Sequence, residues 1–379
     1  MNVMIVVTHL LGTGHLARAL TLARAYKTSG HNVTIASGGM PAPQLDRGDV
    51  QILQLPPLRS DGVNFTVLLD DQGAPASDAM MGDRIAALLG QLTSQAPDVL
   101  ITELFPFGRR ILRAEFEALL QAAHNLPRRP LICASIRDIL APPSKPKKAV
   151  LADQLIDTFY DMVLVHSDRD VTPLELSWPV SETLAPKLHY TGFVAPPAPS
   201  PHPRGSGTNE VVVSAGGGDV GAHIFAAAVG AARQDPDRHW RILVGGADAA
   251  ERGVVLARAA PPNVTVEPAR PDFRQMLHHA AASVSMCGYN TALDILQTGC
   301  PAVFIPFDAG SEVEQGLRAD ALAKLPGIAV LRSADLSPDR LTQALLEVTQ
   351  AVRRAPRQTG FNGARETVKL TARHREAME

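Results

Sequence analysis

The sequence predicts two α/β domains in tandem, each with a parallel β-sheet covered by helices on both faces. Short β-branched runs alternate with helical patterns along the whole chain, which is typical of such sheets. At 379 residues the chain is long for a single hydrophobic core. A proline-rich stretch at 195–208, APPAPSPHPRGSGT, interrupts the alternation, and the same rhythm then restarts. We therefore expect two Rossmann-like, doubly wound domains that face each other across a cleft.

The elements of the first domain, residues 1–194, follow from apolar runs separated by polar turns. Between the first two runs, residues 16–26 space their apolar side chains as an amphipathic helix does. The expected strands lie at 3–8, 32–37, 50–55, 98–103, 130–135 and 162–167.

The second domain, residues 209–355, repeats this pattern after the proline-rich stretch. That stretch lacks the side chains for a core, so we expect an exposed linker. A helical stretch at 338–354 and a glycine-containing break precede a charged helix at 365–377 within the last segment, 356–379. The expected strands lie at 210–214, 240–246, 264–267, 283–287, 302–306 and 328–331.

The composition excludes several classes of protein. Hydrophobic residues make up 45% of the chain and charged residues 20%, and the formal net charge of −2 gives no general attraction to nucleic acid. No stretch approaches the roughly 20 apolar residues of a membrane span. The brief apolar start lacks a basic region and is expected to be a strand, not a signal peptide. Cys133, Cys287 and Cys300 lie beside apolar runs without metal-ligand spacing, which favours buried thiols in a reducing cytoplasm.

Both halves open with a strand followed by glycines. The patterns Gly12-x-Gly14-x-x-Ala17 and Gly216-x-Gly218-x-x-Gly221 each fit the dinucleotide fingerprint, whose backbone N–H groups approach a phosphate. A dinucleotide site also needs an acidic residue at the end of the second strand. The first copy has none there and the second has one two residues late, so an NAD-dependent oxidoreductase is the weaker alternative.

The first turn also carries a histidine, His15. One interpretation is a tight turn without a ligand and a histidine exposed to solvent at the helix start. The other is functional, because doubly wound folds bind their ligands at the carboxyl edge of the sheet, where this turn is expected. An imidazole there would suit a general base, since its unperturbed pKa of about 6.5 lies close to working pH.

Residues 282–318 are the most informative stretch. A strand enters a turn at Gly288, and the next helix opens with Asn290 and Thr291, with Asp294 on the same face as Asn290. Gly299 and Pro301 end this helix. After the following strand, a polar loop presents Glu312, Glu314 and Gln315. Together these residues offer N–H groups for a phosphate, a carboxylate for a ribose diol and polar groups for a sugar.

Here the sequence resembles the GT-B glycosyltransferases, most closely the family 28 branch that contains the peptidoglycan GlcNAc-transferases. The resemblance rests on the glycine–histidine turn, the second glycine loop and the stretch 282–318. It implies that the second domain binds a nucleotide sugar, a UDP-sugar in the first instance, and that the first domain binds the acceptor. It also implies that the C-terminal helix crosses back to the first domain.

The resemblance assigns roles to individual residues. Asp294 matches the acidic residue on the ribose, the pair Glu314-Gln315 contacts the donor sugar, and Arg270 falls near the base-binding loop. Gly217 and Gly218 face the diphosphate, with the N–H groups around Gly288, Asn290 and Thr291. The family usually has two glutamines where this chain has Glu314-Gln315, so Glu314 departs from its pattern. The family also has a longer glycine run before its histidine.

The implied reaction is an inverting transfer in which His15 is the general base. Gly14 and the segment 103–110, which begins at Glu103, lie on the acceptor side. We find no Asp-x-Asp pair on a loop where Mg²⁺ would bridge a diphosphate, so we expect transfer without a metal or other cofactor. A nucleotide-sugar hydrolase, an epimerase and a non-catalytic binding module of the same fold remain alternatives.

The acceptor could be soluble or linked to lipid. Phe105 and Phe107, next to Arg109, Arg110 and Arg113, form either a weak peripheral contact with anionic lipid or an ordinary helix start. Short basic runs alone favour the ordinary interpretation.

Overall fold

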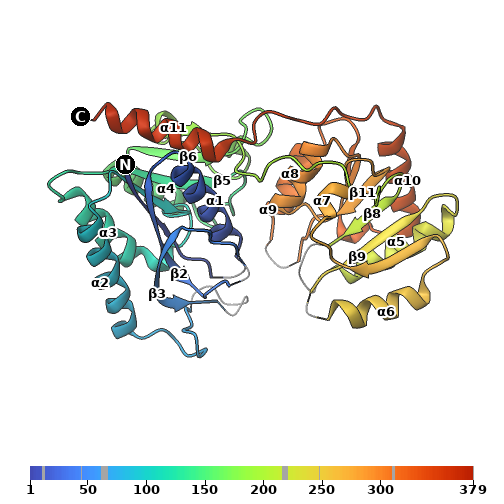
Figure 1. Cartoon of the computed structure of the whole chain (residues 1–379), viewed down its shortest axis with the longest axis horizontal. Coiled ribbons are helices and arrows are strands. Elements are labelled where there is room, and N and C mark those ends of the chain that lie inside the picture. Colours follow the sequence, from blue (N-terminus) through green and yellow to red (C-terminus); the bar gives the residue numbers. More distant parts are fainter. Residues whose placement is uncertain are drawn as a thin grey trace. The chain divides into compact units, whose positions relative to one another are not determined.

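A computed structural model of the chain contains two compact units. The first comprises Met1–Pro196 and Gly360–Glu379, and the second comprises Pro197–Thr359. The structure describes residues 1–10, 13–43, 45–60, 67–215, 221–246, 248–309 and 312–378. In Figure 1 each unit is a twisted sheet with helices packed on it, and the strands within each sheet are parallel. The expectation of two parallel α/β domains is confirmed.

The sheet of the first unit has the strand order β3-β2-β1-β4-β5-β6-β7. The order reverses between β1 and β4, and in doubly wound folds ligands bind at the carboxyl edge of such a switch point. The strands are β1 (Asn2–Val7), β2 (Asn32–Gly39), β3 (Gln51–Leu58), β4 (Val99–Glu103), β5 (Leu131–Arg137), β6 (Met162–His166) and β7 (Leu188–Tyr190). The helices are α1 (Gly14–Thr28), α2 (Asp78–Gln95), α3 (Arg113–His124), α4 (Pro146–Phe159) and α11 (Gly363–Glu376).

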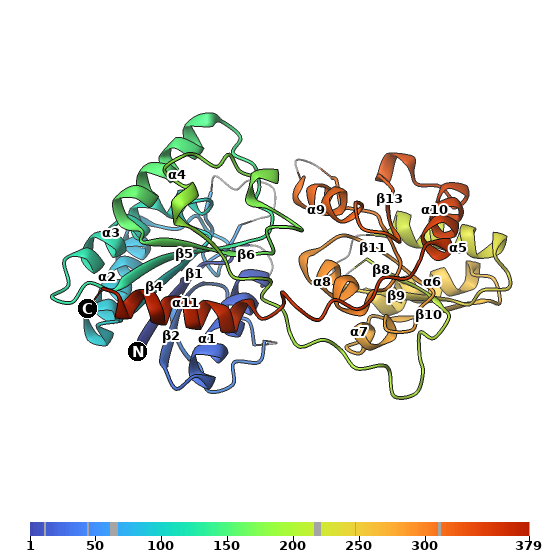
Figure 2. The ribbon, with the colours of Figure 1, turned by 90° about the horizontal axis from the view of Figure 1, so that it is seen from above.

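Helices cover both faces of this sheet (Figure 2), and an apolar layer lies between the sheet and the helices on each face. Helices α2, α3 and α4 pack on one face, where Leu88, Phe116 and Ile156 join the core. Helices α1 and α11 cover the other face, which holds Leu20 and Val368. The alternation of buried side chains along β1 and β4 supplies both layers, because successive residues of a strand point to opposite faces.

The last helix is an integral part of the first unit. The Tyr26 and Thr371 hydroxyls, from α1 and α11, share a buried hydrogen bond of 2.7 Å. The N–H of Phe193 donates to the Gly360 carbonyl at 2.7 Å, so the chain entering α11 is anchored beside the end of the sheet. Backbone and side-chain hydrogen bonds therefore hold the C-terminal segment against the rest of this unit.

The second unit repeats the topology with the order β10-β9-β8-β11-β12-β13, which places its switch point between β8 and β11. Helices α5 and α10 pack together on one face, and α7 and α8 lie on the other (Figure 2). The strands are β8 (Val211–Ser214), β9 (Trp240–Val244), β10 (Val264–Pro268), β11 (Ala282–Ser285), β12 (Ala302–Phe304) and β13 (Ile328–Val330). The helices are α5 (Ala222–Gln234), α6 (Ala249–Ala259), α7 (Phe273–Met276), α8 (Tyr289–Thr298), α9 (Glu314–Leu322) and α10 (Pro338–Gln350).

The segment 195–208 contains no helix or strand and most of its residues are exposed, but it is anchored to the second unit. Its residues from Pro197 onward belong to the second unit, where the Pro197 carbonyl accepts from Arg274 at 3.0 Å. The His202 side chain is 3% exposed, and its Nδ1 accepts from the backbone N–H groups of Arg204 and Ser206. The other ring nitrogen lies 3.0 Å from Asp272. A histidine among the prolines thus anchors the segment, which composition alone did not reveal.

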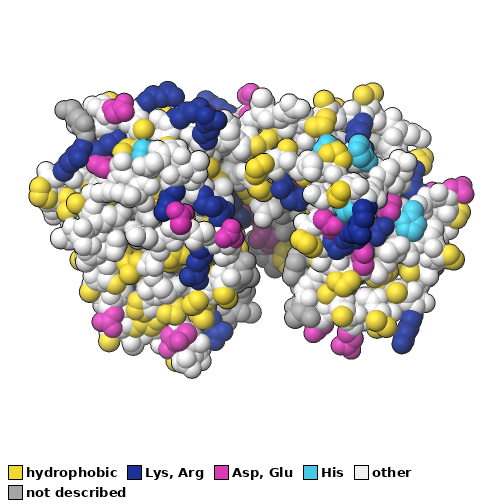
Figure 3. Space-filling model, viewed as in Figure 1, with side chains coloured by type: hydrophobic (Ala, Val, Ile, Leu, Met, Phe, Trp, Pro, Cys, Tyr) yellow, Lys and Arg dark blue, Asp and Glu magenta, His cyan; other side chains and the backbone are white. Residues whose placement is uncertain are grey.

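Surface charge is mixed in sign. On the face shown in Figure 3, Lys and Arg side chains lie among Asp and Glu side chains. Among the described residues, no helix combines the length and the apolar character that crossing a bilayer requires.

Candidate active site

The switch point of the first unit brings two expected residues together. His15 is in the first turn of α1, and Glu103 is the last residue of β4. His15 Nδ1 lies 2.9 Å from Glu103 Oε1, and the two side chains are 15% and 1% exposed. The interpretation of His15 as a solvent-exposed helix-start residue is therefore wrong. Sequence reasoning missed Arg18, which lies one turn further along α1 and pairs with the same carboxylate.

The charges of this cluster follow from burial and pairing. Burial lowers the pKa of His15 to about 4, although its hydrogen bond with Glu103 opposes the shift. Burial alone would raise the pKa of Glu103, but the charge of Arg18 and the contact with His15 outweigh it and hold that pKa well below its usual range. At neutral pH the imidazole is therefore neutral and the carboxylate is ionised. His15 Nδ1 also lies 3.1 Å from a guanidinium nitrogen of Arg18, which itself pairs with Glu103. Because an ionised carboxylate only accepts hydrogen bonds, we assign the Nδ1 proton to the contact with Glu103, which leaves a lone pair on Nε2.

Gly14 and Gly288 each lie at the start of a helix, and the described structure does not require a glycine at either position. A Cβ added at Gly14 or at Gly288 would meet nothing within 4 Å, and neither residue has a positive φ. Gly299 differs, because its φ is +64° and a Cβ at this position would clash with the Arg354 carbonyl, so both conditions demand glycine. The open space beside Gly14 and Gly288 leaves room for a ligand to approach the backbone.

In the second unit, α8 follows β11 directly at the carboxyl edge of the sheet. Gly288 is the N-cap, Asn290 and Thr291 lie in the first turn, and no side chain of the described residues caps that turn. Arg318 donates to the Cys287 carbonyl at 3.0 Å, and its guanidinium lies 5.8 Å from the centre of the Tyr289 ring. Sequence reasoning missed Arg318, which holds the turn from α9.

Asp294 is buried rather than open. It is 6% exposed and forms an ion pair with Arg274 of α7, whose guanidinium also donates to the Gln297 side chain at 2.7 Å. Burial raises the pKa of Asp294, and the Arg274 charge opposes this. The carboxylate expected on a ribose is thus already paired with an arginine of its own unit.

The remaining donor residues lie on the same edge of this sheet, at different distances from α8. Gln315, at the start of α9, accepts from the Phe307 N–H at 3.2 Å, and Glu314 precedes it. Arg270 follows β10, which is separated from β11 by β9 and β8, and it pairs with Asp272 and Glu267. Gly217 and Gly218 lie outside the described residues.

The structure contradicts the less favoured alternative, an interfacial patch after β4, at its two aromatic residues. Phe105 is fully buried and stacks on Phe116, and Phe107 is 3% exposed against Trp178. Arg109 turns inward as well, and donates to the Thr8 carbonyl at 2.6 Å. Apolar residues after a strand end are thus core residues here.

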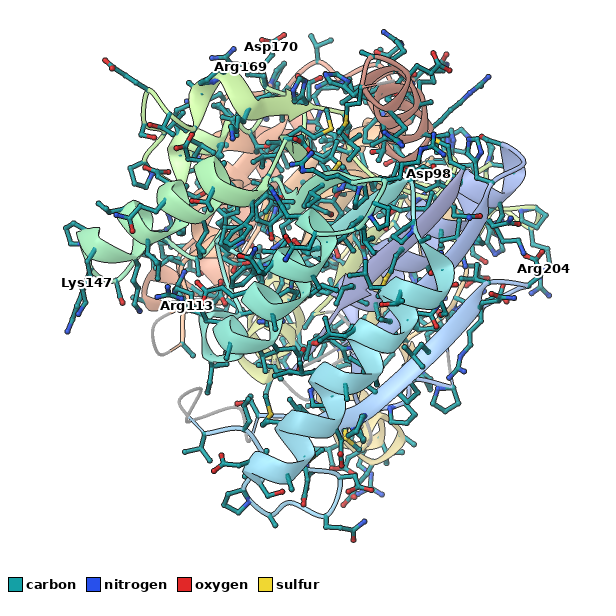
Figure 4. All side chains as sticks on the ribbon, turned by 90° about the vertical axis from the view of Figure 1, so that its left-hand side faces the viewer. Asp98, Arg113, Lys147, Arg169, Asp170 and Arg204 are labelled. Carbon is teal, nitrogen blue, oxygen red and sulfur yellow. The ribbon has the colours of Figure 1, made fainter. Side chains whose placement is uncertain are left out.

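No cluster of three or more His, Cys, Asp or Glu side chains in the described parts of the chain is arranged to hold a metal ion. The chain contains two Asp-x-Asp sequences, at 168–170 and 235–237. The first belongs to the first unit, where Asp170 and Arg169 point outward in Figure 4. The second connects α5 to β9, at the amino edge of its sheet, whereas α8 begins at the carboxyl edge.

Two parallel sheets in Rossmann order, each with a ligand edge at its switch point, define the GT-B class of folds. Within this class, residues 212–371 match the family "Glycosyltransferase family 28 C-terminal domain".

The chain is similar to a UDP-N-acetylglucosamine--N-acetylmuramyl-(pentapeptide) pyrophosphoryl-undecaprenol N-acetylglucosamine transferase of Brucella anthropi, with 32% identity over 136 residues. That match covers 34% of this chain and 36% of the relative, so the chain matches little more than a third of the length of this curated relative.

Solved structures share the fold over nearly the whole chain. MurG of Acinetobacter baumannii has a TM-score of 0.63 at 15% identity, and the match covers 98% of this chain and 99% of that one. A UDP-N-acetylglucosamine 2-epimerase of Listeria monocytogenes, described as putative in its own name, has a TM-score of 0.59 at 11% identity, with coverage of 100% and 97%. At these identities the likeness concerns the fold alone.

Proposed function

We propose that the protein is an inverting glycosyltransferase that moves a sugar from a nucleotide sugar, UDP-linked in the first instance, to an acceptor hydroxyl or amine. The observation that carries the proposal is the match of residues 212–371 to a glycosyltransferase domain. The first unit adds a suitable base, because His15 is neutral and its Nε2 lone pair is not used by Glu103.

In the proposed reaction, His15 Nε2 takes the proton of the acceptor as its oxygen or nitrogen attacks the anomeric carbon. Glu103 holds the Nδ1 proton and stabilises the imidazolium that forms. The departing nucleotide diphosphate is stabilised by the N–H groups in the first turn of α8, around Asn290 and Thr291. By resemblance, the loop with Gly217 and Gly218 contributes further N–H groups. A single displacement inverts the anomeric configuration, and no step requires a metal or other cofactor.

For the donor, we propose that Asp294 binds the ribose, Glu314 and Gln315 contact the sugar, and Arg270 lies near the base. The pairing of Asp294 with Arg274 is compatible with this role, because a carboxylate has lone pairs for a guanidinium and for a ribose hydroxyl.

The first experiment is a thermal-shift panel with UDP-, GDP- and dTDP-sugars, followed by transfer assays with the donor that stabilises the protein. The His15→Ala variant should lower kcat about 10²- to 10⁴-fold, the usual contribution of a positioned base, with donor affinity unchanged. The control is His239→Ala, because His239 is exposed at the amino edge of the second sheet. Activity that EDTA abolishes and Mg²⁺ restores would contradict the metal-independent mechanism.

A hydrolase or an epimerase is the second candidate, because the fold is shared with a protein named as a UDP-N-acetylglucosamine 2-epimerase. Incubation with a UDP-sugar in the absence of acceptor separates the three reactions. Stoichiometric UDP release indicates a hydrolase, an isomerised sugar indicates an epimerase, and an unchanged donor agrees with a transferase.

The acceptor is not specified by the family match, which begins at residue 212. The curated relative is named for a lipid-linked acceptor. For this chain, we place the enzyme in the cytoplasm and propose peripheral membrane contact as a secondary property. The membrane contact is supported by the exposed apolar side chains of Ile111 and Val150. They lie near the outward-pointing Arg113 and Lys147 (Figure 4). Absence of co-sedimentation with anionic vesicles at low salt would favour a soluble acceptor.

A further inference from the structure

Behind Glu103, three buried side chains from successive positions in the sheet form a continuous hydrogen-bonded chain. Ser135 of β5 lies directly across from Glu103 in the strand register, with its Oγ 2.6 Å from Glu103 Oε2. His166, the last residue of β6, places Nε2 3.0 Å from Ser135 Oγ. Thr191, just after β7, places its hydroxyl 2.8 Å from His166 Nδ1. Ser135 and His166 are fully buried, and Thr191 is 5% exposed.

The Glu103 carboxylate determines the direction of each hydrogen bond between Glu103 and Thr191. Glu103 is ionised and only accepts, so the Ser135 hydroxyl donates to Oε2. Ser135 has a single hydrogen, so its oxygen accepts from His166 Nε2–H. Burial lowers the pKa of His166 to about 3, so this ring is neutral and its Nδ1 has no proton. Nδ1 therefore accepts from the Thr191 hydroxyl, and all three donors point toward Glu103.

This arrangement gives the two carboxylate oxygens different partners. Oε1 faces His15 and Arg18, and Oε2 is held by Ser135. A buried carboxylate is stable only with hydrogen-bond donors around it, and losing one of them costs most when the group is charged. Without the Ser135 donor, Glu103 would be easier to protonate, and only the contacts of Oε1 with Arg18 and His15 would orient its side chain.

We propose that Ser135, His166 and Thr191 are positioning residues for the transfer reaction, which keep Glu103 ionised and oriented so that His15 holds its proton on Nδ1 and presents Nε2 to the acceptor. This inference rests on the proposed function. The charged and titratable groups that face the pair are Arg18 and His15 from α1, Arg109 from the loop after β4 and His166 from β6. Of these only His15 changes charge between neutral pH and its pKa of about 4, so it determines the acidic limb of activity.

The test compares variants that remove a hydroxyl with one that keeps it. Ser135→Ala should lower kcat about tenfold and move the acidic limb of the kcat/KM profile upward by about one pH unit, because the pair is protonated more easily. Thr191→Val, nearly the same volume as threonine, should give a smaller shift in the same direction, and Thr191→Ser should restore the wild-type profile. A purely structural role would lower activity equally at all pH values.

A second measurement does not depend on turnover. In ¹⁵N-histidine NMR of the protein without substrates, His15 should carry its proton on Nδ1, and Ser135→Ala should raise the pKa at which His15 titrates. A wild-type protein without transferase activity would overturn the proposed function. The titration would still decide whether Ser135, His166 and Thr191 position Glu103. An unchanged His15 titration in Ser135→Ala, or identical profiles for Thr191→Val and Thr191→Ser, would overturn the positioning role.

Discussion

Replacing Glu103 by glutamine separates its catalytic role from its contribution to stability. The variant keeps the size of the side chain and removes a charge that is 1% exposed and contacts Arg18, His15 and Ser135. When His15 accepts a proton, the imidazolium forms about 4 Å from the carboxylate charge, and at an effective dielectric constant of about 20 that attraction is worth about 4 kcal/mol. Because Arg18 already neutralises part of the carboxylate, we expect kcat to fall about 10²- to 10³-fold.

The same substitution leaves Arg18 buried without the Glu103 charge beside it, so the free energy of unfolding should fall by about 3 kcal/mol or more. Urea unfolding measures this effect, and kinetics below the unfolding transition measure catalysis. The decisive assay is a double-mutant cycle: in a His15→Ala background, Glu103→Gln should lower kcat little further, because the carboxylate acts through the imidazole. Independent, multiplying effects of the two substitutions would refute the reasoning, as would a folded Glu103→Gln enzyme within about threefold of wild-type kcat.

Three further predictions concern binding and stability. Asp294→Ala should weaken UDP binding about tenfold to a hundredfold, through loss of a hydrogen bond to a charged group, and unchanged UDP affinity by calorimetry would remove Asp294 from the ribose site. His15 and His166 have pKa values lowered to about 4 and about 3, so the unfolded chain takes up protons below pH 6.5 while the folded chain does not. Stability should therefore fall as the pH drops below about 6.5, by about 2 kcal/mol for each of these two histidines at pH 5, and urea unfolding of His166→Asn should show a fall that is smaller by about 2 kcal/mol. Removing residues 360–379 should unfold the first unit, because Val368 and Thr371 of α11 are buried against it, and a retained two-step thermal transition would contradict this.

The sequence predicts those features that depend on neighbouring residues. The strand–turn–helix pattern around Gly288 gave the start of α8, and Gly299 ends that helix with a positive φ as expected. The short strand β7, with the residues Leu188–Tyr190, was not predicted because it lacks a β-branched run. The contacts of Phe105 could not be foreseen either, because a loop residue after a strand is equally able to face solvent or core until the packing of α3 is known.

The site around His15 was likewise only partly predictable from the sequence. His15 and Glu103 could be named because His15 begins the helix after the first expected strand and Glu103 ends the fourth. Their partners could not, since Ser135, His166 and Thr191 are ordinary residues about thirty positions apart in sequence. Only the parallel order of the strands brings them together: Ser135 lies opposite Glu103, and His166 lies opposite Arg137, two residues beyond Ser135 on β5. The same holds for Asp294, whose partner Arg274 comes from a helix of four residues.

The buried charges at the switch point of the first unit are better explained by a function than by a contribution to stability. A buried ion pair is weak support for a fold, because well-packed apolar residues of similar volume often do as well or better. The pair Arg84–Glu115 is fully buried, yet its structural role is visible, because Arg84 donates to the Gly38 carbonyl at 3.0 Å and so ties α2 to the end of β2. The Glu103 carboxylate is instead bound by side chains, those of Arg18, His15 and Ser135. Three side-chain donors thus converge on one carboxylate, and one of them is the neutral imidazole of His15, which gains a chemical use when its Nε2 takes up a proton.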